Sequence, residues 1–178
     1  MANRRRNIVV TDYDEHWVSL FEQEAAILRD IFKDELLDIH HIGSTSVPRL
    51  KAKPIIDILP VVKDIARVDD YNESMINIDY EPMHEFGIQG RRYFRKGGIN
   101  RTHQLHVFQF DNTYEIERHL AVRDYLRTHQ EDMIAYGDLK EQLAALHPAD
   151  IEGYCDGKDE FVKALEKRAL EWKRGLTD

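Results

Sequence analysis

Apolar residues recur at spacings of three and four between residues 14 and 32, which predicts an amphipathic helix. The stripe consists of Trp17, Leu20, Phe21, Leu28, Ile31 and Phe32. Asp14 has a suitable side chain for the N-cap of this helix. Two shorter apolar runs follow, at residues 37–42 and 54–62. The second is apolar on both faces, as in a buried strand, and Pro60 predicts that this strand lies at an edge or ends there.

The middle of the chain is richer in glycine and predicts more strands. Residues 64–76 are compatible with a weak helix. Residues 91–96 and 104–110 have strand-like composition and are separated by a loop that contains Gly97 and Gly98. On a regular strand Phe108 and Phe110 would share a face with His106, so this imidazole is expected near the packed side of a sheet.

From residue 112 onward the pattern is helical, in three segments at residues 112–129, 131–146 and 151–174. Asn112 and Glu115 have the spacing of a capping box. Pro148 separates the second segment from the third, because proline disfavours helix in the residue before it. Together the elements predict an α/β (α+β) fold, with a small mixed sheet flanked by helices and a helical C-terminal part. We expect one domain over residues 1–178.

Composition narrows the classes of function. The 178 residues carry a net charge of −8, so binding of nucleic acid is not expected. The triplet Arg4–Arg6 is interpreted as a solvated terminus, with a nucleic-acid arm as the alternative. No apolar run is long enough to span a membrane, and no secretory leader is recognisable. The single cysteine, Cys155, permits no internal disulfide and is expected to be inert, which favours a cytoplasmic protein.

A small polar turn follows the first short strand and has the composition of a phosphate site. Gly43 permits a sharp turn and close approach of a ligand, and Lys53 can add a positive charge. Hydroxyl groups are supplied by Ser44, Thr45 and Ser46. If Thr45 or Ser46 caps a short helix with Pro48 in its first turn, the helix N-terminus would also attract an anion. The alternative is a plain polar turn between strands.

Asp57 lies inside the otherwise apolar second run, where a carboxylate is costly unless it is paired or holds a cation. A hard oxygen ligand beside a phosphate site suits Mg²⁺. The alternative is an ion pair with Arg91, Arg92, Arg95 or Lys96 of the next strand. His106 is either a structural residue or a partner of Asp57, as a metal ligand or as an acid or base.

The stretch His41-Ile-Gly-Ser-Thr-Ser-Val-Pro, followed by Ala52-Lys-Pro-Ile-Ile-Asp57-Ile, resembles the signature of the GrpB-like family. Four later segments agree in order and spacing, namely Leu105–Val107, Arg123–Arg127, Tyr136 with Lys140, and Tyr154 with Lys158. The resemblance covers nearly the whole chain. It implies the nucleotidyltransferase superfamily fold, in which a Gly-Ser turn holds a triphosphate and strand acids hold two Mg²⁺ ions.

The chain departs from that pattern at four positions. Leu59 stands where the superfamily has its second strand acid, and His106 stands where a later strand would supply a third. Arg49 replaces the glycine of a V-P-G-L motif, and Gln104 replaces an expected histidine. One strand carboxylate is a poor site for two hard cations. The resemblance therefore implies the fold, and nucleotidyl transfer does not follow from it.

Three pairs in the helical segments have a spacing of four residues and thus share a helix face: His119 with Arg123, Tyr136 with Lys140, and Tyr154 with Lys158. They are either solvated surface pairs or the lining of one pocket, with cations on phosphate and tyrosines on a base or sugar. Arg91 could join them.

Three hypotheses follow. The first is transfer of a nucleotidyl group from a nucleoside triphosphate to a small molecule, with a divalent metal such as Mg²⁺ at Asp57 and His106. The alternative is a module that binds a nucleotide or other phosphorylated small molecule without chemistry. A hydrolase using a metal at Asp57 and His106 ranks last. The sequence leaves the oligomeric state open.

Overall fold

The computed structural model describes residues 7–176, and five strands in this range form one mixed sheet in the order β1-β2-β5-β4-β3. The strands are β1 (Leu36–Ile42), β2 (Ile56–Val62), β3 (Tyr80–Pro82), β4 (Arg91–Lys96) and β5 (His103–Gln109). The α-helices are α1 (His16–Phe32), α2 (Asn72–Ile76), α3 (Thr113–Thr128), α4 (Gln130–Leu146) and α5 (Ile151–Gly175). β2 and β5 are parallel, and the other neighbours are antiparallel. The expected mixed α/β class with a helical C-terminal part is confirmed.

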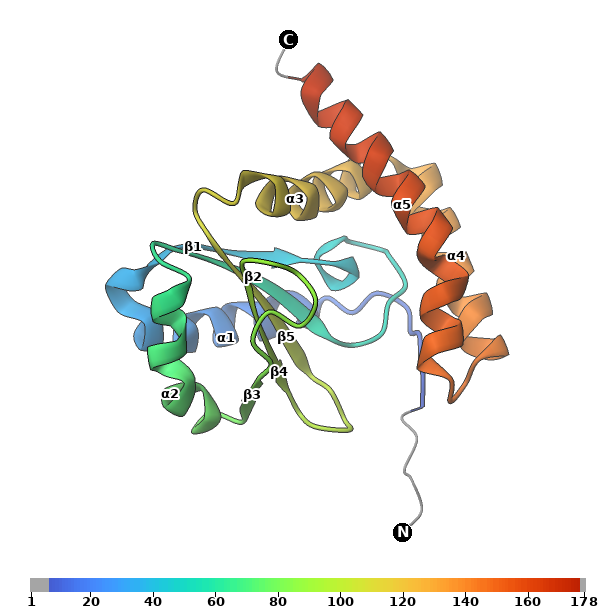
Figure 1. Cartoon of the computed structure of the whole chain (residues 1–178). Helices are drawn as coiled ribbons and strands as arrows, with labels where there is room; N and C mark the ends of the chain where they lie inside the picture. Colours follow the sequence, from blue (N-terminus) through green and yellow to red (C-terminus); the bar gives the residue numbers. More distant parts are fainter. Residues whose placement is uncertain (1–6, 177–178) are drawn as a thin grey trace.

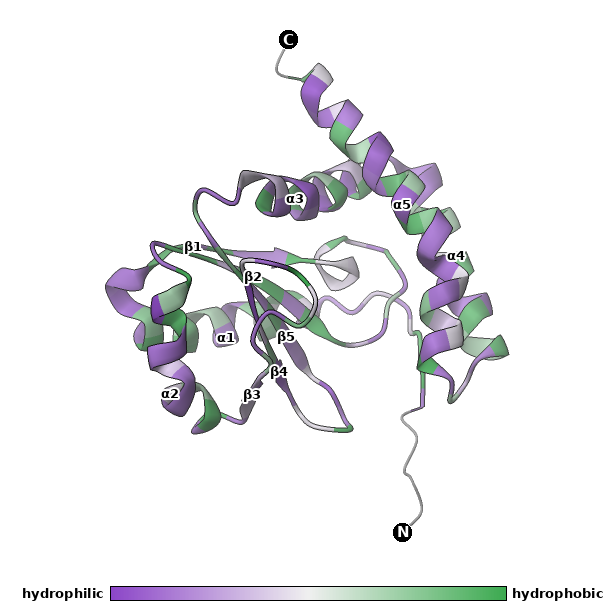
Figure 2. Cartoon of the chain, viewed as in Figure 1, coloured by the Kyte–Doolittle hydropathy of each residue, from purple (hydrophilic) through white to green (hydrophobic). Residues whose placement is uncertain are grey.

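The helices cover both faces of the sheet (Figure 1). α1 and α2 lie on one face, α3 lies on the other, and α4 and α5 form a pair beside the sheet. Hydrophobic and hydrophilic residues alternate along α4 and α5 in Figure 2, as expected for helices with one solvated side. The apolar stripe of α1 packs on the sheet, except that Leu20 is exposed.

The period-two alternation of β2 divides its side chains between the two faces of the sheet. Ile56, Ile58 and Val62 belong to the cluster under α1. Leu59 and Val61 pack instead toward α3, in a cluster with Ile42 and Phe108. Asp57 alternates in phase with Leu59, so its carboxylate is on the α3 side of the sheet.

The prediction that Pro60 marks the edge or the end of its strand is wrong. β2 continues to Val62 and lies between β1 and β5. The β2–β5 ladder pairs Ile58 with Leu105 and Val61 with Phe108, and it omits the two residues between. The missing N–H of Pro60 therefore falls where this ladder is interrupted.

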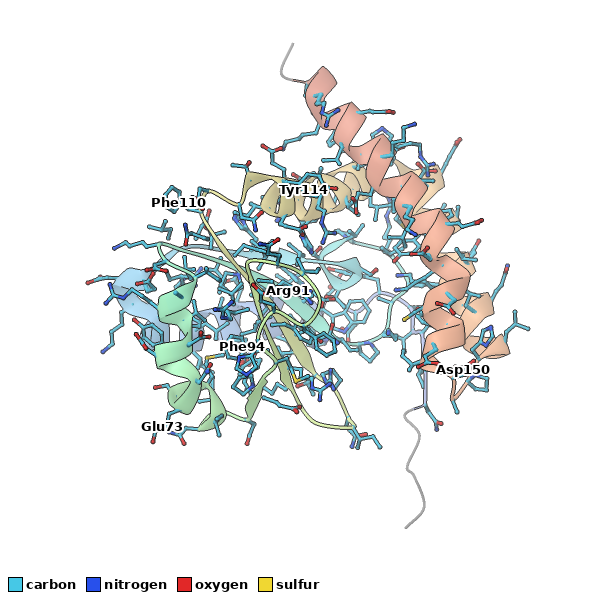
Figure 3. The ribbon with its side chains drawn as sticks, in the orientation of Figure 1. Glu73, Arg91, Phe94, Phe110, Tyr114 and Asp150 are labelled. Carbon is cyan, nitrogen blue, oxygen red and sulfur yellow. The ribbon has the colours of Figure 1, made fainter. Side chains whose placement is uncertain are left out.

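Several expected boundaries also change. Residues 64–76 contain a 3₁₀ helix, η3 (Ala66–Tyr71), followed by the short α2, and β3 was not predicted. Phe110 lies beyond β5, in the exposed turn before α3 (Figure 3). The capping box is wrong, because Asn112 makes no side-chain capping bond and Glu115 pairs with Arg118.

Other expectations concern the surface and the chain ends. The Arg4–Arg6 triplet lies outside the described residues. Within residues 7–176, no helix has both the length and the apolar character needed to cross a bilayer. Cys155 is exposed and forms no disulfide with any described residue. The Asp14 carboxylate accepts a hydrogen bond from the His16 N–H (2.9 Å). The N-cap of α1 is Glu15, so Asp14, the predicted N-cap, lies one residue before it.

Candidate functional site

The Gly-Ser turn connects β1 to a single 3₁₀ turn, η2 (Ser44–Ser46). Gly43 has a φ of 71° and a ψ of −171°, a conformation that favours glycine. The expected capped helix is absent, because η2 has only three residues and Pro48 follows it. The Ser46 hydroxyl donates to the Gly43 carbonyl (2.5 Å), and the Thr45 hydroxyl donates to the Ile55 carbonyl (3.2 Å). These two hydroxyls stabilise the turn itself.

A cavity of about 200 Å³ opens beside this turn, and we call it the lysine cavity. Its lining residues are Gly43, Ser44, Thr45, Ala52, Lys53, Ile55, Asp57, Gln104, Tyr136, Lys140, Tyr154 and Lys158. The turn, the strand acid and the two Tyr–Lys pairs of α4 and α5 therefore meet at one place. Among the other residues predicted for the site, Ser46, Arg91, Arg123 and His106 are not in the lining.

Lys140 is the most deeply buried cation of the lysine cavity, with 2% of its surface exposed. Its Nζ donates to Ser44 Oγ (2.8 Å) and lies 4.3 Å from the centroid of the Tyr136 ring. No carboxylate of residues 7–176 is within ion-pair distance of this ammonium group. Burial lowers the pKa of Lys140 well below 10.5, the neighbouring Lys158 and Lys53 lower it further, and Asp57 opposes them.

Tyr154 separates the other two lysines of the cavity. Its ring centroid is 4.9 Å from Lys53 Nζ and 5.3 Å from Lys158 Nζ, within the range of cation–π interaction. The tyrosine is fully buried, and its hydroxyl has no hydrogen-bond partner among the described residues. Burial raises the pKa of Tyr154, so the phenol is neutral and adds no negative charge.

The Asp57 carboxylate is hydrogen-bonded to His106 of the neighbouring strand β5, with 3.2 Å between Oδ1 and the imidazole Nε2. The other imidazole nitrogen, Nδ1, is 3.4 Å from Nη1 of Arg91. A carboxylate only accepts hydrogen bonds and a guanidinium only donates them, so these partners assign the proton to Nε2. His106 thus orients the carboxylate, and the alternative, an ion pair of Asp57 with Arg91, Arg92, Arg95 or Lys96, is not found.

Two arginines predicted for the phosphate site have other partners. Arg91 donates to the backbone carbonyls of Glu85 (3.2 Å) and Phe86 (2.7 Å), and thereby ties the preceding loop to β4. Arg123 donates to the carbonyl of His41 (3.2 Å) and lines a second cavity. Both are corrections to the expectation that these cations share a pocket with Lys140, because each guanidinium is directed to a carbonyl outside it.

Two histidines, the buried His41 and the partly buried His119, pack around the site. The ring of His41 stacks on Phe21 with 4.8 Å between centroids, and its Nε2 is 2.9 Å from Thr45 Oγ1. Burial lowers its pKa to about 4. His119 contacts His106 and Phe108, and burial lowers its pKa to about 3. Both imidazoles are therefore neutral near pH 7.

The donor set does not fit two Mg²⁺ ions held by protein alone. No group of three or more His, Cys, Asp or Glu side chains suited to a metal occurs within residues 7–176. Leu59 occupies the second acid position and is packed in an apolar cluster. Asp57 faces a cavity with three lysines, and cations at this place compete with a metal ion.

Comparison with known proteins agrees with the sequence motifs. The family model described as GrpB protein matches residues 7–168. The chain belongs to this family. The GrpB crystal structure from Enterococcus faecalis superposes with a TM-score of 0.90 at 52% identity, over 93% of this chain and 99% of that one. Structures of the Cid1 poly(U) polymerase match with a TM-score of 0.48 and 13% identity, a likeness too low to bear on function.

Relatives in the GrpB family differ in length. UPF0157 protein YqkA of Bacillus subtilis is 47% identical over 171 residues, which are 96% of this chain and 50% of that protein. The chain thus spans half the length of YqkA. Glutamate-rich protein GrpB of Alkalihalophilus pseudofirmus is 32% identical over 169 residues, which are 92% of this chain and 96% of that protein.

Proposed function

We propose that the lysine cavity binds the phosphate groups of a small molecule, with nucleotides as the expected class. The observation that carries this proposal is the charge of the cavity. Three lysines and the Ser44 hydroxyl line it, against the single carboxylate of Asp57. Lys140 is buried without a carboxylate partner among the described residues, so its ammonium form is unfavourable unless an anion is bound.

The size of the cavity limits what it encloses. At about 200 Å³ it is smaller than the roughly 300–1,000 Å³ of most small-molecule pockets. A phosphate or diphosphate group fits this volume, and the remainder of the ligand would lie toward the mouth. The ring of Tyr136 in the same lining offers apolar surface to a sugar or base.

Nucleotidyl transfer is the second candidate function. It is supported by the closeness of the Gly-Ser turn to the strand acid, since a Cβ at position 43 would lie 2.7 Å from Asp57 Oδ2. In the nucleotidyltransferase pattern that the sequence resembles, the Gly-Ser turn holds the triphosphate and the strand acids hold the metal ions that act at the α-phosphate. Leu59 in the second acid position counts against this activity and favours binding without chemistry.

Calorimetric titration with inorganic phosphate and with ATP, each with and without Mg²⁺, tests the binding proposal. We expect saturable binding that Lys140→Met weakens about tenfold or more, because one charge-assisted hydrogen bond is lost. Lys163→Met is the matched control, since Lys163 forms an exposed pair with Asp159 on α5. Absence of binding for every anion, or equal weakening by both variants, would refute the proposal.

Asp57→Asn separates the two candidate functions. In an anion site the substitution removes the only negative charge of the lining, so phosphate should bind more tightly without Mg²⁺. In a metal-dependent transferase the same substitution should abolish the Mg²⁺-dependent part of nucleotide binding. Release of pyrophosphate from ATP or GTP in the presence of a metabolite mixture would establish transfer.

A further inference from the structure

A second cavity, of about 290 Å³, lies on the other side of the Gly-Ser turn, between α1, β1 and α3. We call it the arginine cavity, and the lining residues used below are Tyr13, Phe21, His41, Ser46, Arg123 and Arg127. Within the described chain it shares no lining residue with the lysine cavity. The two hollows are separated by the turn, because His41 and Ser46 line one side while Thr45 lines the other.

Two guanidinium groups, one helical turn apart on α3, enter the arginine cavity. Arg127 donates from Nε and Nη2 to a single acceptor, the Ser46 carbonyl, at 3.0 and 2.7 Å. Arg123 donates to the His41 carbonyl and to Asp124. In residues 7–176 no carboxylate is within ion-pair distance of Arg127.

Asp124 pairs with Arg123 (2.8 Å), and the other described charged groups around this cavity form no ion pair with either arginine. Glu22 of α1 lines the cavity without an ion pair to either guanidinium. His40 is 3.2 Å from Asp38, and His41 is neutral near pH 7. Burial lowers the pKa of Arg127, and the charge of Arg123 lowers it further. Two cations are thus held together by backbone carbonyls, with one of them lacking a counter-ion among the described residues.

We propose that the arginine cavity is a second ligand site, which binds the oxyanion of a small molecule through Arg123 and Arg127. A guanidinium recognises planar oxyanions by parallel N–H···O bonds, so carboxylate and phosphate are both suitable. Nη1 of Arg127 makes no hydrogen bond within the described chain and is available for this contact. The side walls of Tyr13 and Phe21 would contact the carbon part of the ligand.

Nuclear magnetic resonance of the unaltered protein tests this proposal at the side chains themselves. The Nε–H signals of Arg123 and Arg127 are followed while inorganic phosphate or succinate is added. Saturable shifts of both signals are expected, and the probe with the lower dissociation constant identifies the oxyanion. Shifts that are absent, or that rise linearly without saturation for both probes, would overturn the proposal.

Two variants distinguish this site from the lysine cavity. Arg127→Gln should weaken binding of the better probe about tenfold or more, and Arg127→Lys should weaken it less because the charge is kept. Lys140→Met should leave the shifts at Arg123 unchanged. If folded Arg127→Gln binds as the unaltered protein does while Lys140→Met does not, only the lysine cavity binds anions. That result would refute this inference and leave the proposed function standing. Circular dichroism of each variant checks that it is folded.

Discussion

Replacement of Gly43 by alanine should destabilise the protein more than the same change at Gly87, another glycine with a positive φ. The φ of 71° and ψ of −171° lie in a region that costs other residues about 1–3 kcal/mol. The new Cβ would also lie 2.7 Å from Asp57 Oδ2 and 3.1 Å from Asp57 Cβ. The carboxylate is held by His106, and β2 is an internal strand, so neither can move without loss of other contacts. Overpacking of this kind adds about 1–3 kcal/mol, for a total of about 2–6 kcal/mol.

Urea unfolding of Gly43→Ala measures this loss, and Gly87→Ala is the matched control. Gly87 has a φ of 85°, but a Cβ there would meet nothing within 4 Å. The control therefore reports the effect of a side chain at a positive φ without the contact to Asp57. We expect the difference between the two variants to be about 1–3 kcal/mol in free energy of unfolding.

A double-mutant cycle assigns the difference to the carboxylate. Asp57→Ala removes the atom at 2.7 Å and keeps the Cβ at 3.1 Å, so Gly43→Ala should cost less in that background. Equal unfolding free energies for Gly43→Ala and Gly87→Ala would refute the reasoning. So would strict additivity in the cycle, because the close approach of the turn to Asp57 would then be absent in solution.

Three further predictions concern the titration of His41, the titration of Lys140 and the backbone conformation of Arg49. The pKa of His41 falls from 6.5 in the unfolded chain to about 4 in the fold, so stability is lost as pH drops through that interval, by about 3 kcal/mol from this group. Urea midpoints between pH 7 and 4 should therefore change less for His41→Gln than for the unaltered protein, and parallel curves would contradict this. The pKa of Lys140 is lowered in the free protein, so binding of phosphate should be accompanied by uptake of a proton and should weaken as pH rises. Calorimetric titration in buffers of different ionisation enthalpy measures the number of protons taken up. Lys140→Met should abolish this uptake. Arg49 has a φ of 69°, which glycine adopts without strain, but glycine also loses more backbone entropy on folding. Because these effects oppose each other, Arg49→Gly should change the unfolding free energy by less than about 1 kcal/mol. A larger loss would show that the Arg49 side chain contributes to stability.

The periodic elements were predictable because their signal is local. The stripe of α1, the strands β1, β4 and β5 and the three long C-terminal helices have the expected type and nearly the expected bounds. The prediction that β2 is an edge strand or ends at Pro60 was wrong. Whether the missing N–H of a proline is tolerated depends on the hydrogen bonds to the neighbouring strand, which the sequence does not show. η3 and α2 replaced the expected weak helix, since packing of Val68 and Met75 on the sheet decides that segment.

The sequence predicted those parts of the candidate site that depend on residues sharing a helix face or on the Gly-Ser motif. A spacing of four residues put Tyr154 with Lys158 on one face, and both line the lysine cavity. Spacing did not show that Lys140 would meet Ser44, which is 96 residues away in the sequence. Nor did it show that Arg123 would enter a different cavity, because the path of α3 across β1 is a tertiary feature. The four-residue step from Arg123 to Arg127 could have indicated that cluster.

The charge distribution explains why a small anion suits the lysine cavity better than a polyanion. The whole chain has a net charge of −8, so its long-range field repels nucleic acid. Lys140 and Lys158 oppose this field only within a cavity of about 200 Å³. Salt screens the long-range repulsion more than it screens contacts with a buried ammonium group. A free phosphate group should therefore keep much of its affinity for the cavity at high ionic strength. For a nucleic acid, high ionic strength would only weaken the repulsion by the chain and would add no attraction.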